Sequence, residues 1–182
     1  MRFLTLLILP FIMTTTTGYI IDFGNTKDGG NWRIVNDGVM GGLSQSNATL
    51  TGNSVKFYGK VSLENNGGFA SIRTLIPEQS LANCKTVTIR YKSKSLTRTF
   101  GLSLKSTQRY YIPYYKHTFN PKTKNWQELK VNLTDFKHYR ISQVIGDSMP
   151  SKALEDVYNI AIIISDKISG PFDIEIDYIK FE

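Results

Sequence analysis

The sequence predicts an all-β protein, an antiparallel jelly-roll β-sandwich. Short apolar or alternating runs recur along the chain with turn residues between them, and no long segment has helical periodicity. Aromatic residues make up 12% of the 182 residues, with ten Tyr and ten Phe, which favours strands. Many short strands without helical crossovers are typical of an antiparallel sandwich or jelly roll.

The chain begins with a segment typical of a secretory signal peptide, which we assign to residues 1–18. Arg2 provides a short basic region, an apolar run follows from Phe3 to Met13, and small or polar residues come next. The run is too short to span a bilayer comfortably, which takes about 20 apolar residues. We expect export to the periplasm or out of the cell, or a membrane anchor if the segment stays uncleaved.

Nine further segments have strand character. Apolar and polar residues alternate in residues 55–63, 69–76, 86–92, 126–133 and 172–181. Shorter apolar or aromatic runs occur in residues 19–23, 99–105, 110–115 and 159–165. The run at 159–165 is continuously apolar, as in a strand buried on both faces. The last alternation places Phe172, Ile174, Ile176 and Tyr178 inward.

Two local patterns add to the strands. Asn66-Gly67 stands between two alternating runs, which is the strongest short hairpin pattern. Residues 151–158 form the best helical stretch, a short one with Ser151 placed to cap it. No internal repeat, linker or composition break is present, so we expect one jelly-roll domain over residues 19–182, long enough to bury a two-sheet core.

The net charge of +7 comes from scattered basic residues with one modest cluster. Arg90, Lys92, Lys94 and Arg98 make up the cluster, and we interpret it as a solvated edge strand, which lysine protects from aggregation. We therefore expect no nucleic-acid partner. Salt-sensitive attachment to an anionic lipid surface stays open, as a peripheral membrane contact.

The chain lacks the residue patterns of common enzymes and metal centres. No Gly-x-Ser-x-Gly elbow or phosphate-binding loop is present, and neither His117 nor His138 has an evident nucleophile. Cys84 is the only cysteine, which excludes an internal disulfide and a thiolate zinc site. Asp22 and Asp177 would suit calcium if the terminal strands were neighbours, although solvated carboxylates are the simpler interpretation. We expect no catalysis, no cofactor and no metal.

Four segments stand out along the chain. They are residues 32–44 (WRIVNDGVMGGLS), 62–73 (SLENNGGFASIR), 126–129 (WQEL) and 170–179 (GPFDIEIDYI). The residues Asn36-Asp37-Gly38 predict a turn, since Asn and Asp tolerate a positive φ and Gly adopts one without steric cost. Gly41-Gly42 allows close approach of the backbone.

In order and spacing, these segments resemble the complex I intermediate-associated protein 30 family over nearly the whole chain after residue 18. The resemblance implies a galactose-binding-like jelly roll, which agrees with the independent strand count. It also implies a non-catalytic role, that of a chaperone-like factor in the assembly of respiratory complex I (NADH:ubiquinone oxidoreductase). The partner would then be a protein, an assembly intermediate of that complex.

An exported carbohydrate-binding module of the same fold is the alternative, with a glycan as ligand. Such modules stack sugar rings on exposed aromatic side chains. The chain has a dense aromatic stretch at Tyr110, Tyr111, Tyr114 and Tyr115, in which Tyr111 and Tyr115 would share one face of a strand. Aromatic residues also serve protein interfaces, so the stretch alone does not choose between the two partners.

The residues expected to form the partner-binding surface come from these segments. Arg73 is included because a guanidinium can bind a carboxylate through two hydrogen bonds. The full set is Asn36, Asp37, Gly41, Gly42, Ser44, Glu64, Asn65, Asn66, Arg73, Tyr111, Tyr115 and Trp126.

Overall fold

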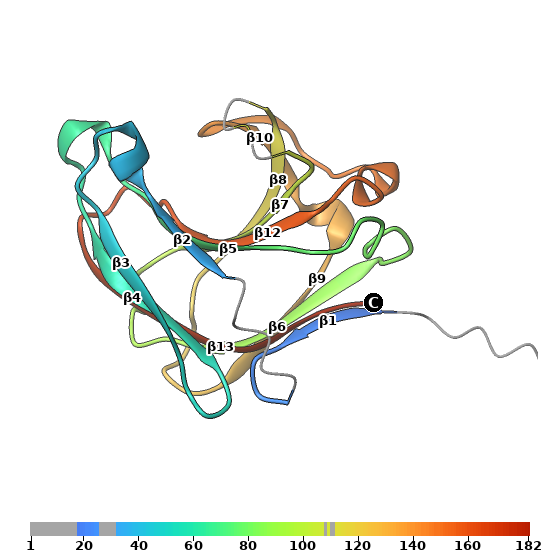
Figure 1. Cartoon of the computed structure of the whole chain (residues 1–182), viewed down its shortest axis with the longest axis horizontal. Coiled ribbons are helices and arrows are strands. Elements are labelled where there is room, and N and C mark those ends of the chain that lie inside the picture. Colours follow the sequence, from blue (N-terminus) through green and yellow to red (C-terminus); the bar gives the residue numbers. More distant parts are fainter. Residues whose placement is uncertain (1–17, 26–31, 108, 110–111) are drawn as a thin grey trace, which may run out of the picture.

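The computed structural model describes residues 18–25, 32–107, 109 and 112–182, and they form a sandwich of two antiparallel sheets (Figure 1). The six-stranded sheet has the order β3-β4-β13-β6-β9, with β1 paired to β13 beyond the end of β4. The seven-stranded sheet has the order β11-β10-β8-β7-β12-β5-β2. The predicted all-β sandwich is confirmed.

The strands are short, apart from the last. Those of the six-stranded sheet are β1 (Tyr19–Asp22), β3 (Gln45–Leu50), β4 (Val55–Val61), β6 (Thr86–Lys92), β9 (Gln127–Asn132) and β13 (Gly170–Phe181). Those of the seven-stranded sheet are β2 (Arg33–Asn36), β5 (Ala70–Leu75), β7 (Phe100–Lys105), β8 (Tyr114–Phe119), β10 (Lys137–Arg140), β11 (Gln143–Gly146) and β12 (Asn159–Ile164).

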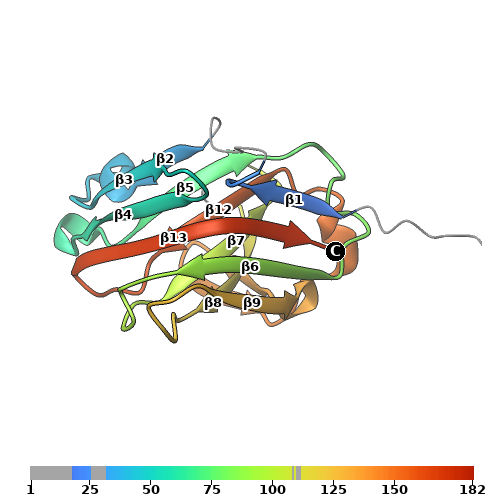
Figure 2. The same ribbon diagram turned by 90° about the horizontal axis from the view of Figure 1, so that it is seen from below.

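The core lies between the two sheets and is built by the alternation seen in the sequence. Strand β12 supplies Ile160, Ile162 and Ile164, all fully buried, and β13 supplies Phe172 and Ile174 from the opposite sheet. Successive side chains of a strand point to opposite faces, so each sheet contributes every second residue to the core. Figure 2 shows β13, the longest strand, running through the middle of its sheet.

Among the described residues the only helices are four short 3₁₀ turns. They are η1 (Asp37–Met40), η2 (Glu64–Asn66), η3 (Leu133–Asp135) and η4 (Ser151–Leu154). The short helix predicted over residues 151–158 is thus a single 3₁₀ turn, and Pro150 rather than Ser151 holds its N-cap position. No helix among the described residues is long and apolar enough to cross a membrane.

Two sequence expectations about strand pairing are wrong. The residues Asn66-Gly67 do not join a hairpin, because β4 belongs to one sheet and β5 to the other. The cluster Arg90–Arg98 does not mark an edge strand either. Strand β6 lies between β13 and β9, and Arg90, Lys92 and Arg98 of the cluster pair with carboxylates.

Two further differences from the sequence expectations concern Tyr178 and the aromatic strand expected at residues 110–115. The register of β13 against β6 shifts between Ile176 and Tyr178, a β-bulge that places one extra residue in β13. Tyr178 therefore points outward, where its hydroxyl donates to Glu128 Oε1 at 2.7 Å. The aromatic strand expected at 110–115 instead begins at Tyr114, and Tyr110 and Tyr111 lie outside the described residues.

Four of the connections that cross from one sheet to the other are those from β2 to β3, from β4 to β5, from β6 to β7 and from β12 to β13. A buried ion pair joins two of them. Arg98 precedes β7 and its Nε donates to Asp166 Oδ2 at 2.8 Å, and Asp166 follows β12. The same guanidinium donates to the backbone oxygens of Ile168, Gly170 and Pro171.

We predict that Arg98→Ala lowers the free energy of unfolding by about 3–5 kcal/mol, because it leaves the Asp166 carboxylate buried without its cation. The control is Lys94→Ala, an exposed cation of the same loop, which should change stability by less than about 0.5 kcal/mol. Urea titration followed by circular dichroism measures both. Equal, small losses in the two variants would contradict a structural role for the pair.

Candidate functional site

The Asp37 carboxylate is the centre of a tight junction between two loops, residues 36–44 and 62–69, which we call the loop junction. Asp37 opens the 3₁₀ turn η1 and is 1% exposed. Its Oδ1 accepts from the Ser44 backbone N–H at 2.8 Å, and its Oδ2 accepts from the Ser44 hydroxyl at 2.5 Å. The backbone N–H groups of Gly68 and Phe69 also donate to Oδ2, at 2.6 and 3.2 Å. One side chain thus holds both loops.

Glycines let the two loops approach this carboxylate. A Cβ atom at Gly42 would overlap the Asp37 carboxyl group, and one at Gly67 would lie 2.7 Å from its Oδ2. On the second loop, Asn65 and Asn66 adopt positive φ of 53° and 60°, which Asn tolerates better than most residues. The Asn65 amide then donates to the Gly41 backbone oxygen at 3.2 Å and closes the junction.

The hydrogen bonds of the junction favour the charged form of Asp37. Burial alone would raise the pKa of this carboxyl, but the bonds from Ser44, Gly68 and Phe69 outweigh burial and hold the pKa below its ordinary value of 3.8. The charged carboxylate therefore stabilises the fold above about pH 4, and this contribution is lost as the pH falls through the lowered pKa.

Of the polar residues predicted for partner binding, Asp37 and Ser44 face into this junction, whereas Glu64, Asn65 and Asn66 are exposed on its second loop. Asp37 and Ser44 are buried, and Asn36 Oδ1 accepts from the Ser46 hydroxyl at 2.6 Å. Beside these polar side chains, the two loops also expose several apolar ones. They are Val39 (74% exposed), Met40 (63%), Leu43 (52%), Leu63 (42%) and, on the adjoining loop, Ile168 (46%). We call these five residues the apolar tip. Lys167 joins its loop to the junction by donating to Gly67 O at 3.4 Å.

The other predicted site residues lie elsewhere and apart from one another. Trp126 lies beside the outer face of the six-stranded sheet, where its ring contacts the Arg90 guanidinium at 4.9 Å and the Lys92 ammonium at 4.5 Å. Tyr115 points to the core side of β8 and stacks on His138, with ring centroids 4.6 Å apart. Tyr111 lies outside the described residues. The described members of the predicted set therefore lie on several different surfaces of the sandwich.

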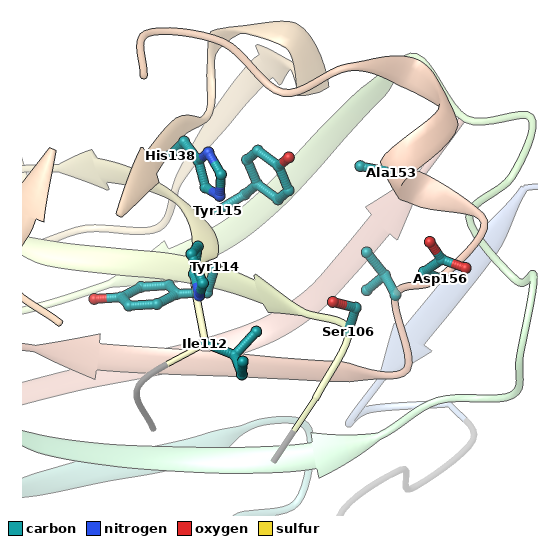
Figure 3. A pocket seen from close by; sticks show the side chains of 9 residues that line it. Ser106, Ile112, Tyr114, Tyr115, His138, Ala153 and Asp156 are labelled. Atoms are coloured by element: carbon teal, nitrogen blue, oxygen red, sulfur yellow. The ribbon is translucent and has the colours of Figure 1, made fainter. Parts of the chain in front are cut away.

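Tyr115 and His138 line a small pocket at the end of the seven-stranded sheet, shown in Figure 3. Its volume is about 290 Å³, and Ala153 and Asp156 approach from the opposite side. Tyr115 is only partly buried, but burial raises the pKa of its hydroxyl, so the phenol stays protonated at neutral pH. The pocket offers aromatic surface together with polar groups, since Ser106 and Asp156 also line it.

Arg73 lies on a different surface, the outer face of the seven-stranded sheet. This sheet curls from β2 and β5 through β7 to β10, so its outer face is concave, and Figure 1 shows no second layer of strands against it. We call it the concave face. Two tyrosines stand on it, Tyr114 and Tyr139, with stacked rings 5.8 Å apart. Lys105 Nζ lies 4.8 Å from the Tyr114 ring and Lys116 Nζ lies 4.2 Å from the Tyr139 ring.

Sequence reasoning missed the concave-face residues Ser103, Lys105, Lys116 and Tyr139. Period-two alternation places Ser103 and Lys105 opposite the apolar Leu102 and Leu104, so their shared orientation was readable. The residues beside them on the next strand could not be predicted, because β7 pairs with β12, more than 50 residues further along the chain.

The two candidate calcium ligands do come close. Strand β1 pairs with β13, and a Cβ atom at Gly24 would lie 3.4 Å from an oxygen of both Asp22 and Asp177. Asp177 pairs with Arg90, and Asp22 accepts from the backbone N–H groups of Gly24 and Asn25. In the part of the chain that the structure describes, no group of three or more His, Cys, Asp or Glu side chains could hold a metal ion.

The sandwich, with its concave seven-stranded sheet, defines a galactose-binding-like fold of the kind found in carbohydrate-binding modules. It is similar to a family 11 carbohydrate-binding module from Clostridium thermocellum in complex with a β-1,3-1,4-mixed-linked tetrasaccharide. The two are 15% identical, the match covers 90% of this chain and 94% of the module, and the TM-score is 0.62. An agarase, AgWH50C, is 10% identical with a TM-score of 0.58. That match covers 91% of this chain and 24% of the agarase.

The sequence itself identifies the family. The family model of complex I intermediate-associated protein 30 (CIA30) matches residues 21–176. The chain therefore belongs to the CIA30 family, as its four segments predict. No curated protein matches the chain. The structural matches, at 10% and 15% identity, establish the fold and not the ligand.

We predict that Asp37→Asn lowers the free energy of unfolding at pH 7 by about 3 kcal/mol or more, since the variant loses a charged acceptor for four buried hydrogen bonds. The loss should shrink as the pH falls below about 4, because the carboxyl of the unfolded wild-type chain then takes up a proton and the contribution of the charged group declines. Urea titrations at both pH values measure this, with the exposed Glu78→Gln as control. A variant as stable as the wild type at pH 7 would contradict the central role of this carboxylate.

Proposed function

We propose that this protein is an exported, non-catalytic carbohydrate-binding domain that holds a glycan on the concave face. The observation that carries the proposal is the composition of that face. Tyr139, stacked on the largely buried Tyr114, provides aromatic surface, while Arg73 and Ser103 provide hydrogen-bond donors within the same sheet. Sugar rings require this combination, because their C–H faces pack on aromatic rings and their hydroxyl groups need polar partners.

Two further observations support this proposal. The signal-peptide pattern of residues 1–18 would send the protein to a compartment where polysaccharides occur. The carbohydrate-binding module described above has the same fold over nearly its whole length. That module holds a mixed-linked tetrasaccharide, so a sandwich of this fold can accommodate a glycan ligand.

We predict that Tyr139→Ala weakens glycan binding about tenfold or more, because it removes one of the two rings of the concave face. Screening the purified protein on an array of neutral and acidic glycans identifies a ligand, and titration calorimetry measures the variant. The matched control is Trp126→Ala, which removes an aromatic ring beside the opposite sheet and should leave the affinity unchanged. Loss of binding in the Trp126 variant alone would refute the concave face as the site.

A second candidate function rests on family membership and on a different surface. As a CIA30 protein, the chain would serve as a chaperone-like assembly factor of respiratory complex I, with an assembly intermediate as partner. The apolar tip suits such a contact, because exposed clusters of apolar side chains mark protein interaction sites. Its five side chains project from loops that Asp37 and Lys167 hold in place. Binding at the tip would therefore require little ordering of the backbone.

We predict for this second function that Met40→Glu abolishes co-purification of respiratory complex I subunits with the tagged protein from its host. A charge at the tip would be desolvated on docking, which is unfavourable. Leu50→Glu is the control, since Leu50 is also exposed (46%) but lies on β3 away from the tip. Absence of complex I subunits from the wild-type sample would exclude the assembly function for this member of the family.

A further inference from the structure

The basic residues of the two sheets are distributed very differently. The strands of the six-stranded sheet contain six basic and five acidic residues. The strands of the seven-stranded sheet contain six basic residues and no acidic residue. These six are Arg33, Arg73, Lys105, Lys116, Lys137 and Arg140. Most of the net charge of +7 is thus concentrated in one sheet.

Strand register aligns four of these cations in one row across the concave face. The paired residues, taken from β2 to β10, are Arg33, Arg73, Ala161, Ser103, Lys116 and Lys137. Their neighbours along the strands, such as Ile72, Leu102 and Ile162, belong to the core. The six residues therefore share the outer face. We call them the basic row.

Desolvation makes the row unfavourable for the folded protein on its own. Lys116 is only 8% exposed, and burial lowers the pKa of both Lys116 and Arg73. Beside the row, burial and then the charge of Arg73 lower the pKa of Lys105 to about 8. No described carboxylate forms an ion pair with Arg73, Lys105 or Lys116. Buried cations without an anion are rare, since they cost stability.

A buried hydroxyl without a partner lies in the middle of the row. Ser103 is 2% exposed, and its Oγ is the one buried side-chain polar atom among the described residues that has no hydrogen-bond partner. Its register neighbours on the concave face are Ala161 and Lys116. Buried polar groups in folded proteins are nearly always paired. The orphaned hydroxyl and the unpaired cations thus occur at the same place.

Flexible side chains cover this place. The stem of Lys116 runs over Gly101, where an added Cβ would lie 2.9 Å from the Lys116 Cδ. Its ammonium group rests on the Tyr139 ring. An unbranched lysine stem can turn to another rotamer and expose the floor of small residues formed by Gly101, Ser103 and Ala161. The concave face can therefore receive a ligand without movement of the backbone.

We propose that the ligand of the concave face is an acidic polysaccharide, one whose sugar rings carry carboxylate groups. Arg73, Lys105 and Lys116 bind the carboxylates, and the Ser103 hydroxyl bonds a sugar oxygen. The guanidinium of Arg73 matches a planar carboxylate, while the two ammonium groups act as point charges. This inference rests on the proposed glycan-binding function and specifies the chemistry of its ligand.

An acidic protein segment fits the face less well. The cores of protein interfaces are depleted in lysine and rely on aromatic or aliphatic anchors that fill pockets. The middle of the basic row instead offers small residues and a hydroxyl. Strands β5, β12, β7 and β8 are paired on both sides, so a peptide cannot add to them as a further strand.

The test measures binding of the full chain to polygalacturonate oligosaccharides and to the same oligosaccharides with their carboxylates methyl-esterified. Titration calorimetry at physiological salt should show tight binding of the acid and at least tenfold weaker binding of the ester. Arg73→Met and Lys116→Met should each lose tenfold or more in affinity and melt at the same or a higher temperature than the wild type. Lys130→Met is the control, because it removes an exposed cation from the opposite sheet and should bind as the wild type does.

Each other outcome has a defined meaning. Equal affinity for the acid and its ester would overturn the acidic-ligand inference and leave the glycan-binding function standing. No binding of either form, nor of any glycan on the array, would overturn both. Equal losses in Lys130→Met would indicate nonspecific attraction and overturn the assigned site. Tighter binding of polyglutamate or of a sulfated polysaccharide than of polygalacturonate would replace the carboxylated sugar with an acidic protein segment or a sulfated glycan.

Discussion

The fold depends on the buried Asp37 carboxylate, because both loops that it holds cross between the sheets. The first crossing leads from β2 to β3 and the second from β4 to β5. Backbone donors from each crossing converge on the same carboxylate. The Arg98–Asp166 pair does the same for the crossings from β6 to β7 and from β12 to β13. The two centres are linked, since Lys167 donates to the Gly67 backbone oxygen in the β4–β5 connection and Ser169 donates to that of Val61 at the end of β4. One end of the sandwich is therefore fixed by buried charge.

The buried charges at that end of the sandwich have hydrogen-bonding or ion-pair partners, whereas the cations of the concave face have no anionic partner among the described residues. Asp37 and Arg98 each have several partners of opposite charge or polarity, so they stabilise a unique loop arrangement. Lys116 and Arg73 are desolvated without an anion. Natural proteins keep such destabilising groups where function requires them. The contrast separates residues that build the sandwich from residues that would bind the proposed ligand.

The sequence predicted the sandwich because period-two alternation depends only on neighbours along the chain. It could not predict which strands pair when they are distant in sequence. The row from Arg33 to Lys137 therefore could not be predicted, although alternation indicates the face of the strand on which each of its residues lies. The Asn66-Gly67 pattern failed for a related reason. Its positive φ serves a loop that changes sheets rather than a hairpin, and the carboxylate that requires this loop lies about 30 residues earlier. The inward orientation predicted for Tyr178 was wrong because the β-bulge before it has no recognisable pattern in the sequence.

The residues that carry the family resemblance and the residues that would choose the ligand overlap only in part. The segments 32–44 and 62–73 carry the resemblance, and the structure uses residues 36–44 and 62–69 of them to close one end of the sandwich around Asp37. Arg33 and Arg73 of the basic row belong to these segments, whereas its other members lie outside them. The segments that carry the family resemblance therefore explain how the loops close, and they do not by themselves name a ligand. The outer positions of β7 and β8, which supply Ser103, Lys105 and Lys116, would select the proposed acidic glycan.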